Sequence, residues 1–179
     1  MFSLIPMTGL RTLGAGLLCA ALGACAPDLN WREVRTDDAH CSILLPAKPA
    51  THARSVNLDG LKVEMQMTGA AVDDLSFTVA SARIPDAAQR VPALAAMQVA
   101  MLRNIGAASH DEKRVTLKGG VEATEVVASG QNARDGKKLL MHARFAIYGD
   151  RVYQAVALGP QDKLSPEAAD TFLGSLSLR

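Results

Sequence analysis

A strict alternation of apolar and polar residues between Leu61 and Thr68 constrains the fold more than any other part of the sequence. The two sets interleave along the chain: Leu61, Val63, Met65 and Met67 alternate with Lys62, Glu64, Gln66 and Thr68. This period of two is that of a β-strand with one buried face and one solvated face. Asp59-Gly60 joins it to another strand-like run, residues 51–58, and is a typical two-residue hairpin turn. The sequence therefore predicts an antiparallel sheet.

Further strands are predicted on both sides of this hairpin. A short apolar run, Cys41–Leu45, stops at Pro46, because proline cannot donate to a sheet ladder. Further strand patterns cover residues 75–80, 114–118, 121–128, 139–148 and 152–158. Turn residues separate the later ones: Gly119-Gly120, the polar loop 130–136 and Gly149-Asp150. Because the last two runs are apolar on both faces, we expect them at the centre of the sheet, covered on both sides.

Two helices are predicted, the first over residues 91–105. Its apolar face follows the period of 3.6 residues, with Pro85 and Pro92 at its start and Gly106 at its end: Leu94, Met97, Met101 and Ile105. Methionine thioethers can bind soft metals, but Met97 and Met101 have no ligand partner at a suitable spacing, so we interpret them as core residues. The second helix begins at Ser165-Pro166-Glu167, a cap followed by a first-turn proline.

The amino-terminal residues have the organisation of a bacterial lipoprotein signal peptide. Arg11 precedes an uncharged, mostly apolar run that ends in Leu22-Gly23-Ala24-Cys25, which matches the lipobox cut by lipoprotein signal peptidase. We therefore expect residues 1–24 to be removed and Cys25 to become the acylated first residue. One alternative is a plain secretory signal with A-x-A cleavage. The other is a membrane-spanning helix, for which the charge-free run 12–27 is short of the roughly 20 residues required.

The residue after the cysteine bears on where such a lipoprotein resides. In enterobacterial lipoproteins an aspartate there tends to retain the protein at the inner membrane, so by resemblance Ala26 predicts the periplasmic face of the outer membrane. Residues 25–39 would form a lipidated tether and a short amino-terminal segment, followed by a single domain over residues 40–179. We expect Trp31 and Val34 to dock on the domain as a short helical turn; alternatively, Trp31 lies among lipid headgroups.

Charge and cysteine content exclude several classes of function. Only Arg11 among the charged residues lies in the removed segment, so the mature chain carries 18 basic and 18 acidic residues, a balance that argues against a nucleic-acid partner. Cys19 leaves with the signal peptide and Cys25 takes the lipid, so Cys41 has no disulfide partner. A reactive thiol is one interpretation of Cys41, but a lone cysteine in a strand is more often a small buried hydrophobe.

No catalytic, metal or cofactor site is predicted. The four histidines have no metal-ligand spacing: His40, His52, His110 and His142. Three acid pairs fall in predicted turns and are interpreted as solvated loops rather than calcium sites: Asp37-Asp38, Asp73-Asp74 and Asp111-Glu112. His142 and Arg144 lie on one face of their predicted strand. Together they could line a small anionic pocket, although a surface pair or salt-bridged pair is the preferred interpretation.

Three segments resemble small bacterial envelope domains similar to the PsbP and Ran-binding Mog families. They are Leu45–Pro49, the stretch Gly149–Pro160 and the closing segment Ala169–Leu176. The resemblance covers about residues 40–179, although Ala123 stands where these relatives often have glycine. It implies an α+β fold: an antiparallel sheet of about seven to eight strands with helices packed on its faces, an α/β/α sandwich. It also implies binding or assembly rather than catalysis.

The sequence thus predicts a membrane-anchored periplasmic lipoprotein that is not an enzyme and contacts an envelope protein. Such a protein should expose an apolar patch of several hundred square ångströms, roughly 300–600 Å² or more. The alternative is a small-ligand carrier or hydrolase with a pocket between helix 91–105 and the sheet.

Overall fold

The computed structural model describes residues 29–36 and 40–179. The predicted signal peptide, the lipidation site Cys25, the sorting residue Ala26 and the acid pair Asp37-Asp38 lie outside the described residues.

Most of the domain is one antiparallel sheet of seven strands in the order β3-β4-β5-β9-β8-β7-β6. Its strands in chain order are β3 Ala50–Leu58, β4 Leu61–Val72, β5 Leu75–Arg83, β6 His110–Thr116, β7 Glu122–Gln131, β8 Lys138–Tyr148 and β9 Arg151–Pro160. A second, three-stranded sheet has the order β1-β2-β10. It consists of β1 Arg32–Thr36, β2 Cys41–Leu45 and β10 Ser177–Leu178, and the two helices are α1 Ala87–Asn104 and α2 Pro166–Gly174.

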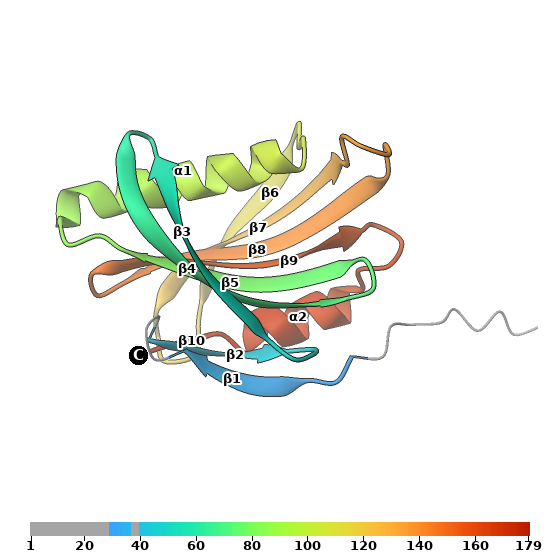
Figure 1. Cartoon of the computed structure of the whole chain (residues 1–179), viewed down its shortest axis with the longest axis horizontal. Coiled ribbons are helices and arrows are strands. Elements are labelled where there is room, and N and C mark those ends of the chain that lie inside the picture. Colours follow the sequence, from blue (N-terminus) through green and yellow to red (C-terminus); the bar gives the residue numbers. More distant parts are fainter. Residues whose placement is uncertain (1–28, 37–39) are drawn as a thin grey trace, which may run out of the picture.

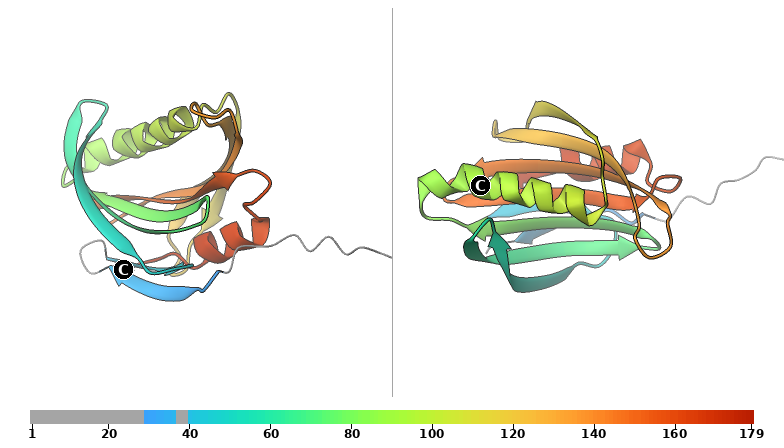
Figure 2. Two further views of the ribbon diagram at one scale, coloured as in Figure 1. Left: turned by 45° about the vertical axis from the view of Figure 1, so that its right-hand side comes forward. Right: turned by 90° about the horizontal axis from the view of Figure 1, so that it is seen from above.

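Each face of the large sheet carries its own hydrophobic core. On one face α1 buries Met97 and Ile105 against strand residues such as Phe145. On the other face α2 and the small sheet form the second core, in which the rings of Trp31, Phe77 and Phe172 meet edge to face. Figure 1 shows α1 along one side of the curved sheet, with α2 and the small sheet on the other, and Figure 2 shows the same arrangement from two further directions. The α+β expectation therefore holds in its coarse form, with a fold that is mainly β.

The predicted central hairpin is confirmed. β9 is the fourth of the seven strands and lies between β5 and β8. Eight of its ten residues are buried, as expected for a strand with a core on each face.

The hairpin between β3 and β4 is also confirmed. Asp59 and Gly60 both have positive φ angles, 52° and 91°, as a type I′ turn requires. The Asn57 side chain accepts a hydrogen bond of 2.6 Å from the Gly60 amide and supports the turn.

β4 continues four residues beyond the predicted strand, and its buried face changes along its length. Val63 and Met65 are buried under α1, whereas Thr68 and Ala70 are buried on the opposite face. The extension was missed because Gly69-Ala70-Ala71 carries no apolar alternation. Past Met67 the α1 side of this strand is therefore only partly covered.

Helix α1 begins at Ala87, so the prediction of a start at residue 91 is wrong. Asp86 caps it by accepting a 2.9 Å hydrogen bond from the Ala88 amide, and Pro92 lies inside the helix. Because the Ala88 residue is exposed, water can satisfy the carbonyl that Pro92 leaves without a helical donor. The predicted end is confirmed: Gly106 has φ +62° and donates to the Arg103 carbonyl, while Ala107 donates to the Leu102 carbonyl, which is a Schellman motif.

The amino-terminal segment differs from the expected helical turn. Trp31 and Val34 do pack against the core, but Val34 belongs to strand β1, which pairs with β2 in antiparallel register. β2 also pairs with the two-residue strand β10, which was not predicted. Pairing with β1 and β10 satisfies the backbone N–H and C=O groups on both edges of β2. Local sequence patterns do not show which segments will provide this pairing. None of the helices described here is long and apolar enough to cross a membrane.

Candidate functional site

The strongest charge cluster lies on the α2 face of the large sheet and joins three neighbouring strands. Lys113 of β6, Glu125 of β7 and Arg144 of β8 stand directly opposite one another in the register. The Lys113 Nζ atom lies 2.8 Å from Glu125 Oε1, and Arg144 Nε and Nη2 lie 2.8 and 2.7 Å from Glu125 Oε2. The Glu125 side chain is only 8% exposed and that of Arg144 16%. A nearly buried carboxylate is thus held between two cations.

Arg144 also ties this cluster to helix α2. Its Nη1 donates a 2.8 Å hydrogen bond to the carbonyl of Leu173, in the last turn of the helix. A cation at this end interacts favourably with the helix dipole, and the Leu173 carbonyl that it contacts also accepts a 3.3 Å hydrogen bond from the Leu176 amide. The guanidinium is therefore occupied on all three of its nitrogens by the protein itself.

This arrangement decides between the two interpretations of His142 and Arg144. They do lie on one face of β8, but Arg144 forms a salt bridge with Glu125 instead of lining an anionic pocket with His142. The reason is that Glu125 occupies the guanidinium donors that an external anion would need. His142 is half-buried, and its pKa is lowered by burial, an effect that the nearby carboxylates of Asp170 and Glu125 partly oppose.

The position of Glu125 between two cations also determines its pKa. Burial by itself would raise the pKa of this carboxyl, but hydrogen bonds from Lys113 and Arg144 outweigh it and hold the pKa below its usual value. The bond to Glu125 in turn raises the pKa of Lys113. Glu125 and Lys113 are therefore both charged at neutral pH, which suits a structural cluster better than a proton-transfer site.

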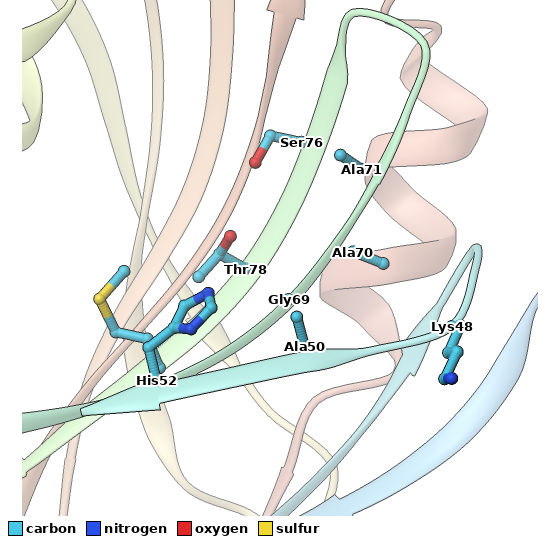
Figure 3. A pocket seen from close by; sticks show the side chains of 9 residues that line it. Lys48, Ala50, His52, Gly69, Ala70, Ala71, Ser76 and Thr78 are labelled. Atoms are coloured by element: carbon cyan, nitrogen blue, oxygen red, sulfur yellow. The ribbon is translucent and has the colours of Figure 1, made fainter.

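A shallow groove of about 330 Å³ lies on the opposite face, where β3, β4 and β5 extend past the cover of α1. Nine residues line it: Lys48, Ala50, His52, Met67, Gly69, Ala70, Ala71, Ser76 and Thr78. In Figure 3, His52 and Thr78 lie near each other on one side of the groove, and Lys48 stands at its other end.

The groove offers hydrogen-bonding groups without the arrangement that catalysis needs. Its polar side chains are an imidazole, two hydroxyls and an ammonium, and none of its lining residues is acidic or a cysteine. A serine or threonine nucleophile requires a base that is itself oriented by a third group. No lining carboxylate is present to orient His52.

Gly69 forms part of the floor of this groove for a packing reason. A Cβ atom there would approach the Phe77 carbonyl oxygen and Thr78 Oγ1 to 2.7 Å each. The missing side chain therefore keeps β4 close to the side chains of β5.

The outward face of α1 is apolar over its middle part, between Val91 and Ala100, and carries the exposed Arg103 in its last turn. Val91 and Val99 are 67% and 53% exposed, and Ala95 and Ala100 between and beside them add no charge. Open grooves flank the helix, one of about 520 Å³ toward β3 and one of about 410 Å³ toward β7 and β8.

The space between α1 and the sheet is filled along the middle and end of the helix, whereas a groove of about 260 Å³ opens between the start of α1 and the β3–β4 turn. Ala93, Met97 and Ile105 on the inner face of the helix are each at most 2% exposed and pack in the core. Met97 therefore serves as a core residue and the half-buried Met101 packs against the same core, as interpreted from the sequence. Among the residues that the structure describes, no group of three or more His, Cys, Asp or Glu side chains is arranged to hold a metal ion.

The other candidate residues have structural contacts. Cys41 is fully buried with its Sγ 3.0 Å from Thr36 Oγ1, and burial raises the pKa of its thiol. In the pair Asp73-Asp74, Asp74 forms a 2.6 Å salt bridge with Lys163, which lowers the pKa of Asp74. In the pair Asp111-Glu112, Glu112 lies 2.9 Å from the ring of His110.

Of the three residues in the charge cluster, only Arg144 was singled out from the sequence. Glu125 lies within the run Val121–Ala128, where nothing distinguishes it from a solvated residue. Its burial and its pairing with Lys113 depend on the register of three strands. That register cannot be read from the local sequence.

Comparisons with known proteins bear on the fold alone. No known family and no curated protein matches the sequence. A crystal structure from Bacteroides thetaiotaomicron VPI-5482 superposes with a TM-score of 0.51 at 11% identity, over 83% of this chain and 48% of that one. The chain thus spans about half the length of that protein. A Pseudomonas aeruginosa protein of unknown function gives a TM-score of 0.37 at 15% identity, covering 75% of this chain and 85% of that one, which is too low to carry an argument.

Proposed function

We propose that this chain is a lipid-anchored protein of the bacterial cell envelope whose domain binds another protein and catalyses no reaction. In this proposal residues 1–24 are a signal peptide, Cys25 carries the acyl chains, and Ala26 directs the protein to the periplasmic face of the outer membrane. The lipobox ending in Cys25 supports the anchor.

The observation that carries the binding function is the outward face of α1. Only three large hydrophobic side chains are exposed within the described part of the chain, and two of them, Val91 and Val99, lie on this helix. Full burial of such a side chain contributes about 1.5–3 kcal/mol, so a partner that covers both valines gains affinity there. Contiguous exposed apolar patches of several hundred square ångströms mark interaction sites, and in this proposal such a patch is centred on the two valines.

The finer fold assignment belongs to the same proposal. We assign the domain to an α/β/α sandwich of the PsbP/Mog-like type, supported by α1 and α2 on opposite faces of the sheet. The three resembling segments fall at the end of β2, in the β8–β9 hairpin and in α2. The resemblance implies binding or assembly, in agreement with the proposed function.

A small-ligand carrier is the second candidate, favoured by the groove beside His52 and Thr78. It is the weaker one, because Met97 and Ile105 fill most of the predicted location between the helix and the sheet, and the groove of about 260 Å³ beside the start of the helix is open. Useful ligand pockets enclose most of their ligand, whereas this groove is open.

Two measurements test the proposal. Palmitate labelling should be present in the native chain and lost in Cys25→Ser; unchanged labelling would refute the anchor. For the binding face, a photo-crosslinking amino acid at Val99 should form one defined protein adduct in the native envelope, and Val91→Lys should abolish it.

The matched control carries the same crosslinker at Asp111, an exposed residue of edge strand β6. Equal adducts at both positions, or none at Val99, would count against binding through α1.

A further inference from the structure

The first described residues fix where the tether joins the domain. The Asn30 amide donates a 2.9 Å hydrogen bond to the Pro46 carbonyl in the β2–β3 loop. Leu29 and Trp31 pack against the core beside it, and the Trp31 ring lies 5.6 Å from that of Phe77. The chain is therefore attached to the body of the domain from Leu29 onward.

Little chain remains between this attachment and the proposed lipid. Only Ala26, Pro27 and Asp28 separate Cys25 from Leu29. Four residue steps of at most 3.6 Å span no more than about 14 Å. The 11 residues of β8, by comparison, extend over about 36 Å. A domain longer than its tether cannot turn freely, and the surface around Leu29 must remain close to the headgroups.

Several loops share this end of the domain. The β4–β5 turn and the β9–α2 loop are joined by the Lys163–Asp74 salt bridge. The β9–α2 loop is joined to the start of β8 by the hydrogen bond from the Gln161 amide to the Lys138 carbonyl. Figure 1 and the left view of Figure 2 place the beginning of β1 at the same end as these loops.

The opposite end is defined by the other turns. The β3–β4 turn at Asp59-Gly60 and the β8–β9 turn at Gly149-Asp150 lie at the far ends of their strands. Helix α1 begins there, where the Ile84 amide bonds the Asp150 carbonyl, and ends toward the tethered end, where Gln131 donates to the Ile105 carbonyl.

We propose that the tethered end, made of the β2–β3 loop, the β4–β5 turn, the loop 132–137 and the β9–α2 loop, is the surface that lies against the phospholipid headgroups. This inference rests on the proposed lipidation of Cys25. Basic and acidic side chains nearly balance on this surface: Lys48, Arg134, Lys137, Lys138 and Lys163 lie with Asp73, Asp74, Asp135 and Asp162. The short tether, and not a basic patch, therefore sets the orientation, which should not depend on salt or on anionic lipid.

This orientation has a consequence for the binding face. Because α1 runs from the far end toward the tethered end, its axis points toward the bilayer. Its outward face therefore faces sideways, parallel to the membrane surface, and is not covered by the bilayer. A partner that stands on the same membrane can then reach Val91 and Val99.

The test uses single thiols on the full lipidated chain. Cys41 is 0% exposed and Cys25 is acylated, so a new surface cysteine is the one site that a fluorophore can label under native conditions. Asp162→Cys and Lys48→Cys probe the tethered end, Lys62→Cys and Gln89→Cys the far end, and Arg35→Cys the outer strand β1. Labelled protein is reconstituted in phosphatidylcholine vesicles that contain lipids with a quencher at the headgroup level.

We expect strong quenching at the two tethered-end positions, severalfold weaker quenching at the other three, and the same pattern in high salt. Equal quenching everywhere, or stronger quenching at Arg35→Cys, Lys62→Cys or Gln89→Cys, would overturn the inference. The same positions on a Cys25→Ser background should show no quenching.

Mass spectrometry of the amino terminus separates the two proposals. An acylated Cys25 with a reversed quenching pattern refutes the orientation alone. An unacylated Cys25 in the native host refutes the lipid anchor and the orientation with it.

Discussion

Replacement of Glu125 by leucine removes the centre of the charge cluster on the α2 face. In Glu125→Leu the guanidinium of Arg144 keeps its bond to the Leu173 carbonyl but loses both contacts to the carboxylate, at 2.8 and 2.7 Å. Breaking a buried ion pair by removal of one partner costs about 3–5 kcal/mol, because the other charge stays buried and unpaired. Since the Arg144 side chain keeps 16% exposure, we expect the lower end of this range, about 3 kcal/mol.

Urea denaturation of the mature chain carrying Cys25→Ser measures this loss of unfolding free energy. In thermal unfolding it corresponds to a fall in Tm of about 6–12 °C for a domain of this size. Glu122→Leu is the matched control: it lies on the same strand, but its side chain is exposed and bonds only the Thr116 hydroxyl at 2.9 Å. The control should change stability by about 0.5 kcal/mol or less. A loss at Glu125→Leu no larger than that of the control would refute the account of the cluster.

The pH dependence provides a second check on the same variant. The pKa of Glu125 in the folded protein lies below its ordinary value of 4.5. Its stabilising contribution is therefore fully present above about pH 4.5 and is lost as the pH falls through the folded pKa. The difference in stability between the parent and Glu125→Leu should accordingly shrink as the pH is lowered below 4.5.

Two other predictions follow from packing. A Cβ atom at Gly130 would clash with the Ile105 carbonyl oxygen, so Gly130→Ala should destabilise the domain by roughly 2 kcal/mol or more in urea denaturation, while Gly174→Ala, with open space around it, should not. Cys41 is fully buried with a raised thiol pKa, so it should react with a thiol reagent at pH 8 at least a hundredfold more slowly in the native Cys25→Ser chain than in urea; comparable rates would contradict its burial.

The sequence predicted correctly those turns and helix ends that depend only on neighbouring residues. The Asp59-Gly60 turn needs two residues that tolerate positive φ, and both are adjacent in the sequence. The end of α1 at Gly106 and the cap of α2 at Ser165 likewise depend on single residues, and Ser165 accepts from the Ala168 amide as such a cap should.

The errors occurred where distant segments decide the structure. Trp31 and Val34 suggested one apolar turn, but pairing with β2 draws the segment into a strand. The two-residue strand β10 exists only because the other edge of β2 is open to it. The cluster around Glu125 requires three strands in register, so of its three members only Arg144 was found from the sequence.

The change of buried face along β4 has a consequence for how the domain comes apart. Val63 and Met65 belong to one core, and a few residues later Ala70 belongs to the other. Because β4 contributes to both hydrophobic cores, it cannot leave one core without disturbing the other. We therefore expect the domain to unfold in one cooperative transition, without an intermediate that keeps one core intact.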